Sequence, residues 1–198
     1  MKMKIVQVGE PVLRQAAQPL TSSQIKTRET VQLIESMRET MYEAPGVGLA
    51  APQVGLPLAL AVIEDKPEYT KDIPADVLAG RGRHPVPFHV IINPKITLLG
   101  EPDVSFFEGC LSLPGFTAVV ARSLGVRVEC LDHLGNEQII EASGWYARIL
   151  QHEIDHLQGG VYIDRMQTRT FMSLENYLAY WKTKSMNETL QALGMKGP

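Results

Sequence analysis

The stretch that decides the fold reads SGWYARILQHEIDHL and covers residues 143–157. Its apolar residues recur three and four positions apart, which is the spacing of one face of an α-helix. This side of the helix is built by Trp145, Ile149, Leu150, Ile154 and Leu157. Gly159 follows and supplies a stop, because glycine readily adopts the left-handed conformation in which many helices end. We therefore expect a helix at the centre of the domain.

Segments with the character of strands flank this helix. The compact or alternating apolar runs typical of strands are residues 58–63, 88–92, 95–99, 104–107, 124–131 and 138–141. The last two runs flank Gly135-Asn136 and predict a hairpin. Helical spacing is also found over 22–43, which Ser22 or Ser23 can cap, and over 173–183. The pattern predicts an α+β fold with mostly antiparallel β-sheets packed around the central helix, an N-terminal helix and a C-terminal helix.

The composition suits one globular domain. The chain has 198 residues, and its 44% of hydrophobic residues can fill a core without a disulfide or a structural metal. We expect a single domain over residues 1–170 and a helical tail over 171–198. A net charge of −3 gives no basic excess, which argues against direct nucleic-acid binding. No membrane span is expected, and Cys110 and Cys130 are expected to be free thiols.

The segment HEIDH, residues 152–156, has the spacing of a metal site. Residues four apart lie one above the other on a helix face, so the imidazoles of His152 and His156 can bind one metal ion. Glu153 is expected to point toward the same cleft, where it can take a proton from a reacting water. Two histidines can share a helix by chance, but this spacing with a glutamate in second place favours a mononuclear metal hydrolase.

The third metal ligand has several candidates on spacing alone. A protease class that continues the helix motif to a third histidine is excluded, because Tyr162 stands at that position. A thermolysin-like protease takes a glutamate from a later helix, and Glu175 stands nineteen residues beyond His156. A thiolate is the other option, and Cys110 follows Gly109, where backbone can approach closely. Spacing leaves both open, together with a non-catalytic metal-binding module in which Glu153 is incidental.

Three motifs in this order resemble the peptide deformylase family. They are GVGLAAPQ at residues 46–53, EGCLS at 108–112 and QHEIDHL at 151–157, and the resemblance covers about residues 5–165. It implies that residues 1–170 are a catalytic domain in which Cys110, His152 and His156 hold one divalent metal ion. Fe²⁺ is the native ion that the resemblance implies, and Zn²⁺, Ni²⁺ or Co²⁺ suit the same ligands. The long charged segment 64–87 is expected to form a surface excursion. Its length is similar to that in the organellar and plant-like branch of the family.

The resemblance also implies the reaction, which is removal of the formyl group from N-terminal formylmethionine with release of formate. Glu153 is the implied acid and base, and the Gln53 side chain and the Leu111 N–H are the implied donors to the developing oxyanion. Gly48 and Gly109 are expected to pair with the main chain of the substrate. The alternative for Gly48 is a simple turn residue after the preceding helix.

A pocket for the methionine side chain is implied by the same motifs. Its walls are expected from Val47, Phe106, Trp145, Arg148 and Ile149. Trp145 is expected either to narrow this pocket or to pack beneath the metal helix. The stem of Arg148 is expected to line the pocket, with the charge at its rim.

The expected partners follow from the implied substrate. They are N-formylmethionyl nascent peptides and, transiently, the ribosome, with neither nucleic acid nor membrane bound directly. The implied location is the cytoplasm of a bacterium, or the matrix or stroma of an organelle if a transit peptide has been removed. No feature of the sequence predicts an oligomeric state.

Overall fold

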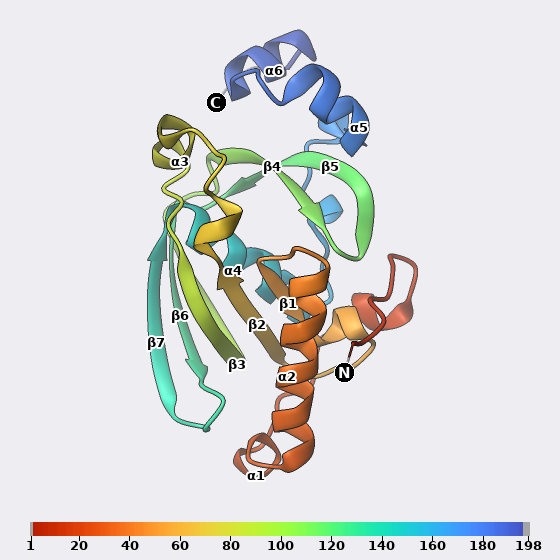
Figure 1. Ribbon diagram of the computed structural model, residues 1–198, viewed down its shortest axis with the longest axis vertical. Coiled ribbons are helices and arrows are strands. Elements are labelled where there is room, and N and C mark those ends of the chain that lie inside the picture. Colours follow the sequence, from red (N-terminus) through yellow and green to blue (C-terminus); the bar gives the residue numbers. More distant parts are fainter. Residues whose placement is uncertain (1, 196–198) are drawn as a thin grey trace.

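The structure, a computed structural model, describes residues 2–195. Its larger sheet has five strands in the order β1-β2-β3-β6-β7, and all neighbouring pairs are antiparallel (Figure 1). The strands are β1 (Gly48–Ala50), β2 (Leu60–Asp65), β3 (Val86–Leu99), β6 (Gly125–Leu131) and β7 (Glu137–Ser143). The predicted hairpin is confirmed as β6 and β7, and Gly135 supplies the positive φ of its turn.

Two helices cover the opposite faces of this sheet. They are α4 (Gly144–Leu157) and α2 (Arg28–Glu43). Since successive strand residues point to opposite faces, Ala61 and Ile63 of β2 pack on the side of α4, while Leu60 and Val62 pack on the side of α2. Burial of each large aliphatic side chain contributes about 1.5–3 kcal/mol. The central helix is confirmed, and it ends at Gly159 (φ +80°) as predicted.

A second sheet has three strands in the order β4-β5-β8. They are β4 (Val104–Cys110), β5 (Leu113–Arg122) and β8 (Met172–Ser173). The sequence did not predict β5, because Pro114 and Gly115 interrupt its start and its buried part does not alternate. Ala118 and Val120 of β5 pack against Tyr162, which lies just beyond the end of α4. The predicted α+β class with antiparallel sheets around a central helix is confirmed.

The two strands predicted over 88–92 and 95–99 are one strand, β3, which bends at Asn93. This residue has a φ of +52°, and the register with the neighbouring strand shifts between Ile92 and Lys95. The Asn93 side chain holds the bend, because its Oδ1 accepts from the Leu20 N–H at 2.9 Å and its Nδ2 donates to the Leu20 carbonyl at 2.8 Å. The prediction of two strands was wrong, since the chain turns without leaving the sheet.

The helix predicted over 22–43 is divided into α1 (Ser22–Ile25) and α2. The Thr21 side chain caps α1, so neither Ser22 nor Ser23 is the cap. Thr27 caps α2 in the same way, and its extended backbone (φ −72°, ψ 153°) ends the first helix. A threonine that caps a helix cannot also continue one, which explains the division.

The surface segment predicted over 64–87 is found over residues 66–85, with a 3-10 turn (Pro67–Tyr69) and α3 (Ala75–Gly80). The end of this segment is tied to the start of α4, where the Trp145 N–H donates to the Gly82 carbonyl at 3.4 Å. Arg83 then forms a two-point ion pair with the buried Asp65 of β2, at 2.7 and 2.8 Å. The segment therefore touches the helix that carries the metal motif.

The C-terminal region begins with α5 (Leu174–Asn176) and continues as a π-helical turn (Tyr177–Trp181). These match the predicted helix over 173–183, and α6 (Met186–Ala192) follows without having been predicted. Figure 1 shows α5 and α6 beyond β4 and β5, at the end of the molecule opposite α1. Residues 196–198 of the expected tail lie outside the described residues.

Composition led to two further expectations. Cys110 and Cys130 are free thiols, as expected. Within residues 2–195, no helix is both long and apolar enough to cross a membrane.

Short 3-10 turns connect the larger elements at Pro11–Arg14, Ala51–Val54, Tyr162–Asp164 and Thr168–Thr170.

Candidate active site

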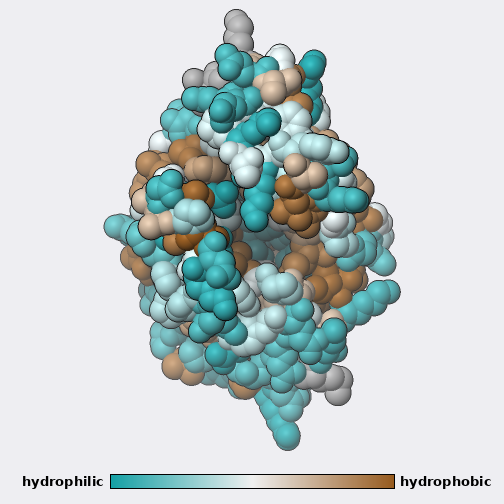
Figure 2. Space-filling view, turned by 45° about the horizontal axis from the view of Figure 1, so that its top comes forward, coloured by the Kyte–Doolittle hydropathy of each residue, from teal (hydrophilic) through white to brown (hydrophobic). Residues whose placement is uncertain are grey.

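A cleft of about 610 Å³ lies between the start of β1, the β4–β5 hairpin and α4, and α5 borders it. Figure 2 shows the molecule hollowed near the middle of one face, with hydrophobic surface on either side of the hollow. The residues that the sequence singled out for chemistry meet here, because the cleft is lined by Gln53, Cys110, His152 and Glu153 together. A concave, mostly apolar site with a few convergent polar groups is the usual form of a catalytic pocket.

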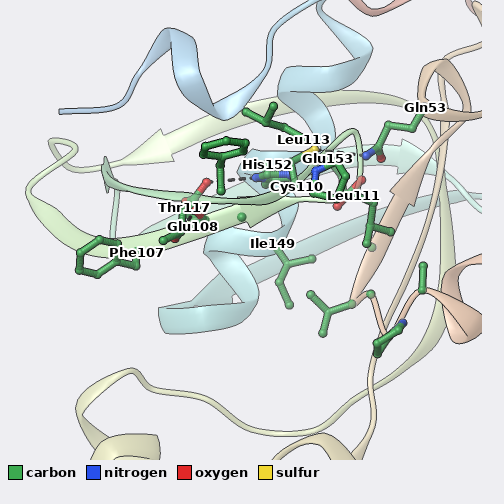
Figure 3. A pocket seen from close by; sticks show the side chains of 18 of the residues that line it. Gln53, Phe107, Glu108, Cys110, Leu111, Leu113, Thr117, Ile149, His152 and Glu153 are labelled. Carbon is green, nitrogen blue, oxygen red and sulfur yellow. Dashed lines mark hydrogen bonds and ion pairs between the residues drawn. The ribbon is translucent and has the colours of Figure 1, made fainter. Parts of the chain in front are cut away.

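Helix α4 supplies two of the candidate metal ligands. His152 and His156 stand one turn apart, and their rings meet edge to face with centroids 5.0 Å apart. The third group comes from the turn between β4 and β5, where Cys110 Sγ lies 3.3 Å from His156 Nε2. One ligand atom from each of the three residues falls within 4.8 Å of the others. Figure 3 shows Cys110 and His152 side by side in the cleft.

These positions decide between the ligands that spacing left open. Glu175 is exposed on α5 and is absent from this cluster, whereas Cys110 is part of it. Across residues 2–195 the structure brings together one group of three or more His, Cys, Asp or Glu side chains with metal-binding geometry. The thermolysin-like alternative is therefore wrong, and Cys110, His152 and His156 form the metal-binding triad.

The donor set fits a divalent metal ion. One thiolate and two imidazoles are the ligands of Zn²⁺ and of late first-row ions, and three protein ligands leave a position open for chemistry. Burial lowers the pKa of His156 well below its ordinary value, which keeps this imidazole in the neutral, metal-binding form. Burial also lowers the pKa of His152, but hydrogen bonds to Cys110 and Glu108 outweigh it and raise the pKa above the ordinary value. Cys110 and Glu108 thus favour a positive charge beside them.

Glu108 orients the first histidine ligand. Its Oε2 lies 3.0 Å from His152 Nδ1 (dashed in Figure 3), so that the Nε2 atom of His152 faces the cluster. Burial raises the pKa of Glu108, but hydrogen bonds from His152 and Arg122 reverse this effect and the pKa falls well below its ordinary value. Glu108 therefore remains a carboxylate behind the metal ligands.

The charge of Glu108 is balanced by buried arginines. Arg122 donates to both Glu108 oxygens at 3.0 and 2.9 Å, and to Asp155 at 2.5 Å. Asp155 of α4 also accepts from Arg165 at 2.8 Å, so it connects the metal helix to two arginines outside it. Glu108 and Arg122 were not assigned roles from the sequence. One signal for Arg122 was available, because it directly follows the apolar run Ala118–Ala121. An arginine at the end of such a run can be buried, and a buried arginine needs a carboxylate partner.

Glu153 is buried within the cleft and lies against the backbone of β1. Its Oε2 has no hydrogen-bond partner among the described residues, and burial raises its pKa to about 7. A β-carbon built on Gly48 would lie 2.2 Å from Glu153 Oε1, so this glycine leaves the space that the carboxylate fills. An unpaired buried carboxyl group with a pKa near neutrality is suited to accept and return a proton.

Gln53 and Leu111 border the same space. Gln53 Oε1 accepts from the Ala50 N–H at 2.9 Å, which turns its Nε2 toward Cys110 Sγ at 3.4 Å. In Figure 3 the Gln53 side chain points toward Cys110 and Glu153. Leu111 follows the cysteine directly and lines the cleft. Two potential hydrogen-bond donors thus lie next to the triad.

The structure corrects two expectations about the methionine pocket. Phe106 is absent from the cleft lining. Its ring instead packs edge to face on the Trp145 ring, with centroids 6.2 Å apart. Its neighbour Phe107 lines the cleft. Adjacent strand residues point to opposite sides, so a shift of one residue exchanges them. The charge of Arg148 is buried instead of lying at the rim, because it donates to Glu108 Oε1 at 2.6 Å and to the Val120 carbonyl at 3.0 Å.

The other expected pocket and backbone residues do line the cleft. They are Val47, Gly48, Gly109, Trp145, Arg148 and Ile149. Trp145 borders the cleft and also packs against the core around α4, and its narrowing of the pocket stays a prediction. The cleft is further lined by Phe107 of the predicted strand β4. Three more lining residues, Arg83, Phe116 and Leu174, had no signal in the sequence because they come from a surface segment, an unpredicted strand and the tail.

Comparison with known proteins points to one family. The model of the family described as polypeptide deformylase matches residues 2–171. Peptide deformylase 1A, chloroplastic, of Solanum lycopersicum is 48% identical over 172 residues, which are 87% of this chain and 62% of that protein. Peptide deformylase 3 of Streptomyces avermitilis is 45% identical over 196 residues, which are 99% of this chain and 85% of that protein. This chain thus spans less than two thirds of the tomato protein and most of the Streptomyces protein.

The fold agrees with solved structures of the same family. The structure of a class I type b peptide deformylase from Acinetobacter baumannii, with Met-Ala-Ser bound, matches with a TM-score of 0.73 at 29% sequence identity. The match covers 84% of this chain and 99% of that chain. The two-sheet arrangement around α4 is therefore shared with that protein.

Proposed function

This chain belongs to the peptide deformylase family, a family of metal-dependent amidohydrolases, and we infer that its cleft removes the formyl group from N-terminal formylmethionine. The observation that carries this inference is the triad of Cys110, His152 and His156 beside the unpaired carboxyl group of Glu153. A metal triad with an open position and an adjacent base is the equipment for attack by water on an amide. The products are formate and a free amino terminus.

We propose that the triad holds one divalent ion and that Fe²⁺ is the native one, with Zn²⁺, Ni²⁺ or Co²⁺ able to replace it. When bound, such an ion favours ionisation of a water and polarises a carbonyl group. The mixed sulfur and nitrogen donors support this proposal, since they suit late first-row ions better than Mg²⁺ or Ca²⁺. Glu108 keeps His152 oriented for this task by accepting from its Nδ1.

Glu153 is the proposed acid and base. It takes the proton of the attacking water as the water oxygen bonds to the formyl carbon. It then gives this proton to the amine nitrogen as the carbon–nitrogen bond breaks, so that formate and the amine leave. The pKa of about 7 supports both steps, because proton transfer is most effective when the pKa of the group lies near the working pH.

The Gln53 side chain and the Leu111 N–H are the proposed donors to the oxygen on which negative charge develops. The anchored amide of Gln53 supports this role, since its Oε1 is held by the Ala50 N–H and its Nε2 faces the triad. A donor that is already positioned before the reaction needs no reorganisation during it. Loss of one such donor raises the barrier by about 2.7–4 kcal/mol.

Recognition of the substrate is proposed for the remaining cleft residues. Gly48 and Gly109 pair with the main chain of the formylmethionine in an extended form, which is supported by their lack of side chains at the two sides of the cleft. The methionine side chain packs against Val47, Trp145, Arg148 and Ile149. Arg148 contributes its stem there, while its charge remains on Glu108.

The setting of this activity is also proposed. Nascent peptides that begin with formylmethionine are the substrates, and contact with the ribosome is transient. The location is a bacterial cytoplasm or the matrix or stroma of an organelle. Residues 1–170 form the catalytic domain and 171–198 a helical tail, a division that the end of the family match at residue 171 supports.

The test is a formate-release assay on formyl-Met-Ala-Ser with protein purified with and without oxygen, followed by metal analysis. Formate production with one Fe²⁺ per chain, and loss of activity on oxidation, is the expected result. Cys110→Ala is expected to lose both metal and activity, while Glu175→Ala keeps both. Absence of formate from the anaerobic preparation, with metal bound, contradicts the proposed function.

A further inference from the structure

The C-terminal segment that follows the family match is attached to the wall of the cleft. Strand β8 pairs with the cleft-lining part of β5, with Ser173 opposite Phe116 and Met172 opposite Thr117. The Phe171 ring stacks on the Phe116 ring with centroids 5.1 Å apart and an interplanar angle of 8°. The backbone and ring contacts together fix where the next residues begin.

The residues after β8 then reach the cleft itself. Leu174 lines the same cleft as Glu153 and Cys110, and the Tyr177 ring packs on the cleft-lining Phe107 ring with centroids 4.6 Å apart. In Figure 3, Phe107 and Gln53 lie on opposite sides of Cys110, His152 and Glu153. The tail therefore covers the Phe107 side, away from the oxyanion donor Gln53. We call Phe171, Leu174 and Tyr177 the tail wall.

The tail wall is apolar and only partly covered. Leu174 is 43% exposed, Phe171 is 39% exposed, and Phe116 opposite them is 41% exposed. Exposed large apolar side chains that are continuous with a binding cleft mark a surface that a ligand covers. Leu178 of the same segment is 52% exposed but does not line the cleft, so exposure alone does not place a residue in the wall.

We propose that the tail wall binds the residues that follow formylmethionine in the substrate and favours an apolar side chain there, with Leu174 as the specificity-determining contact. The proposal rests on the proposed function, since it takes the formyl group to lie next to Glu153. The ligand of the tail wall is the substrate polypeptide itself. Leu174 borders the cleft in which the methionine is held, and the rest of the substrate chain has to leave this cleft. The proposal assigns the second and third residues to the wall, because an extended chain that advances about 3.3 Å per residue leaves the methionine through them first.

The experiment compares three amidated peptides, formyl-Met-Ala-Ser, formyl-Met-Leu-Ser and formyl-Met-Ala-Leu, by their kcat/KM for formate release. With the unmodified protein, leucine at the second or third position is expected to raise kcat/KM about fivefold, as partial burial of one aliphatic side chain predicts. Leu174→Asp is expected to abolish this advantage, and Leu174→Ala to reduce it. The comparison within each variant is a ratio, so altered metal loading cancels.

The matched control is Leu178→Asp, which puts the same charge on the same segment outside the cleft. It is expected to keep the full preference for leucine, and thermal melts establish that all variants are folded. The proposal is overturned if the unmodified protein shows no leucine preference, if Leu174→Asp retains it, or if Leu178→Asp loses it equally. Failure of the proposed function looks different, since formyl-Met-Ala-Ser itself would then yield no formate.

Discussion

Single residues decide where the reactive carboxyl group lies, and Gly48 is the sharpest case. Any side chain at this position would begin 2.2 Å from Glu153 Oε1, so the backbone of β1 and the carboxyl group can approach only through a glycine. The φ of Gly48 is not in the left-handed region, so the requirement is one of space alone. From the sequence, the same glycine could be read as a simple turn residue after a helix.

Gly48→Ala is expected to lower kcat about 10²-fold while the protein stays folded, because displacement of a catalytic group by about 1 Å has a cost of this order. The measurement is a formate-release assay beside a thermal melt. A double-mutant cycle with Glu153→Gln tests the cause. If Gly48 acts through Glu153, the alanine adds little to the loss already caused by Glu153→Gln. Full additivity of the two losses would contradict this explanation.

Glu108 shows how one buried charge serves both the fold and the site. It accepts from His152, Arg122 and Arg148, so its removal leaves two buried arginines short of a counter-charge. Breaking a buried ion pair from one side is costly because the remaining charge stays desolvated.

Glu108→Gln is expected to lower the free energy of unfolding by roughly 3–5 kcal/mol and the metal affinity by about 10–100-fold. Urea unfolding of the metal-free protein and competition with a chelator measure the two effects separately. Glu129→Gln is the control, since this glutamate pairs with Arg127 on the surface with its side chain 60% exposed, and its loss should change stability by less than about 0.5 kcal/mol. Equal effects of the two changes would argue against a special role of Glu108.

At the scale of elements, the start of α4 is where the surface segment meets the metal helix. Gly144 has a φ of +63°, and a β-carbon on it would lie 2.7 Å from the Gly82 oxygen and 3.0 Å from the Arg81 oxygen. This close approach also brings Arg81 and Arg83 over the Trp145 ring, each at 5.3 Å from its centroid. The segment predicted only as a surface excursion therefore supports the first turn of the helix.

Gly144→Ala is expected to destabilise the protein by about 1–3 kcal/mol, since it combines a strained backbone with a steric clash. Gly135→Ala is the matched control, because Gly135 has a similar φ of +83° but only ordinary contacts from 3.5 Å outward. Urea unfolding should show the larger loss for Gly144→Ala, and the difference measures the clash. A larger loss of stability for Gly135→Ala would show that the backbone at Gly82 can move away from the new β-carbon without destabilising the protein.

At the scale of the whole molecule, the metal triad links two layers of the fold. Cys110 belongs to the three-stranded sheet, while His152 and His156 belong to the helix that packs on the five-stranded sheet. A bound ion therefore stabilises the contact between the layers in addition to its role in chemistry, because a ligand that binds only the folded state stabilises it.

Chelation of the metal-loaded protein is expected to speed hydrogen exchange in β4 and β5 near Cys110 by about tenfold or more, while β2 and β3 change little. Exchange followed by mass spectrometry with and without EDTA measures this difference. Cys110→Ser provides the control, since its β4 and β5 should already exchange quickly and respond little to EDTA. Equal acceleration in both sheets would show that the metal stabilises the molecule as a unit.

The sequence by itself determined the parts of this protein that depend on neighbours along the chain. The helix over 144–157, its paired histidines, Glu153 beside them and the hairpin at Gly135 all follow from short-range periodicity and turn chemistry. The family motifs added Cys110 and Gln53 by resemblance. Local pattern was less reliable where a side chain alters the path, as at Asn93, which bends a strand, and Thr27, which divides a helix.

Only the tertiary structure decided between residues whose roles depend on distant contacts. It selected Cys110 over Glu175, placed Phe107 instead of Phe106 in the cleft, and turned the Arg148 charge inward onto Glu108. It also paired Glu108 with Arg122 and brought Leu174 of the tail to the cleft. The physical reason is the same throughout: burial and ion pairing are properties of the space that several elements enclose, and no single segment contains that space.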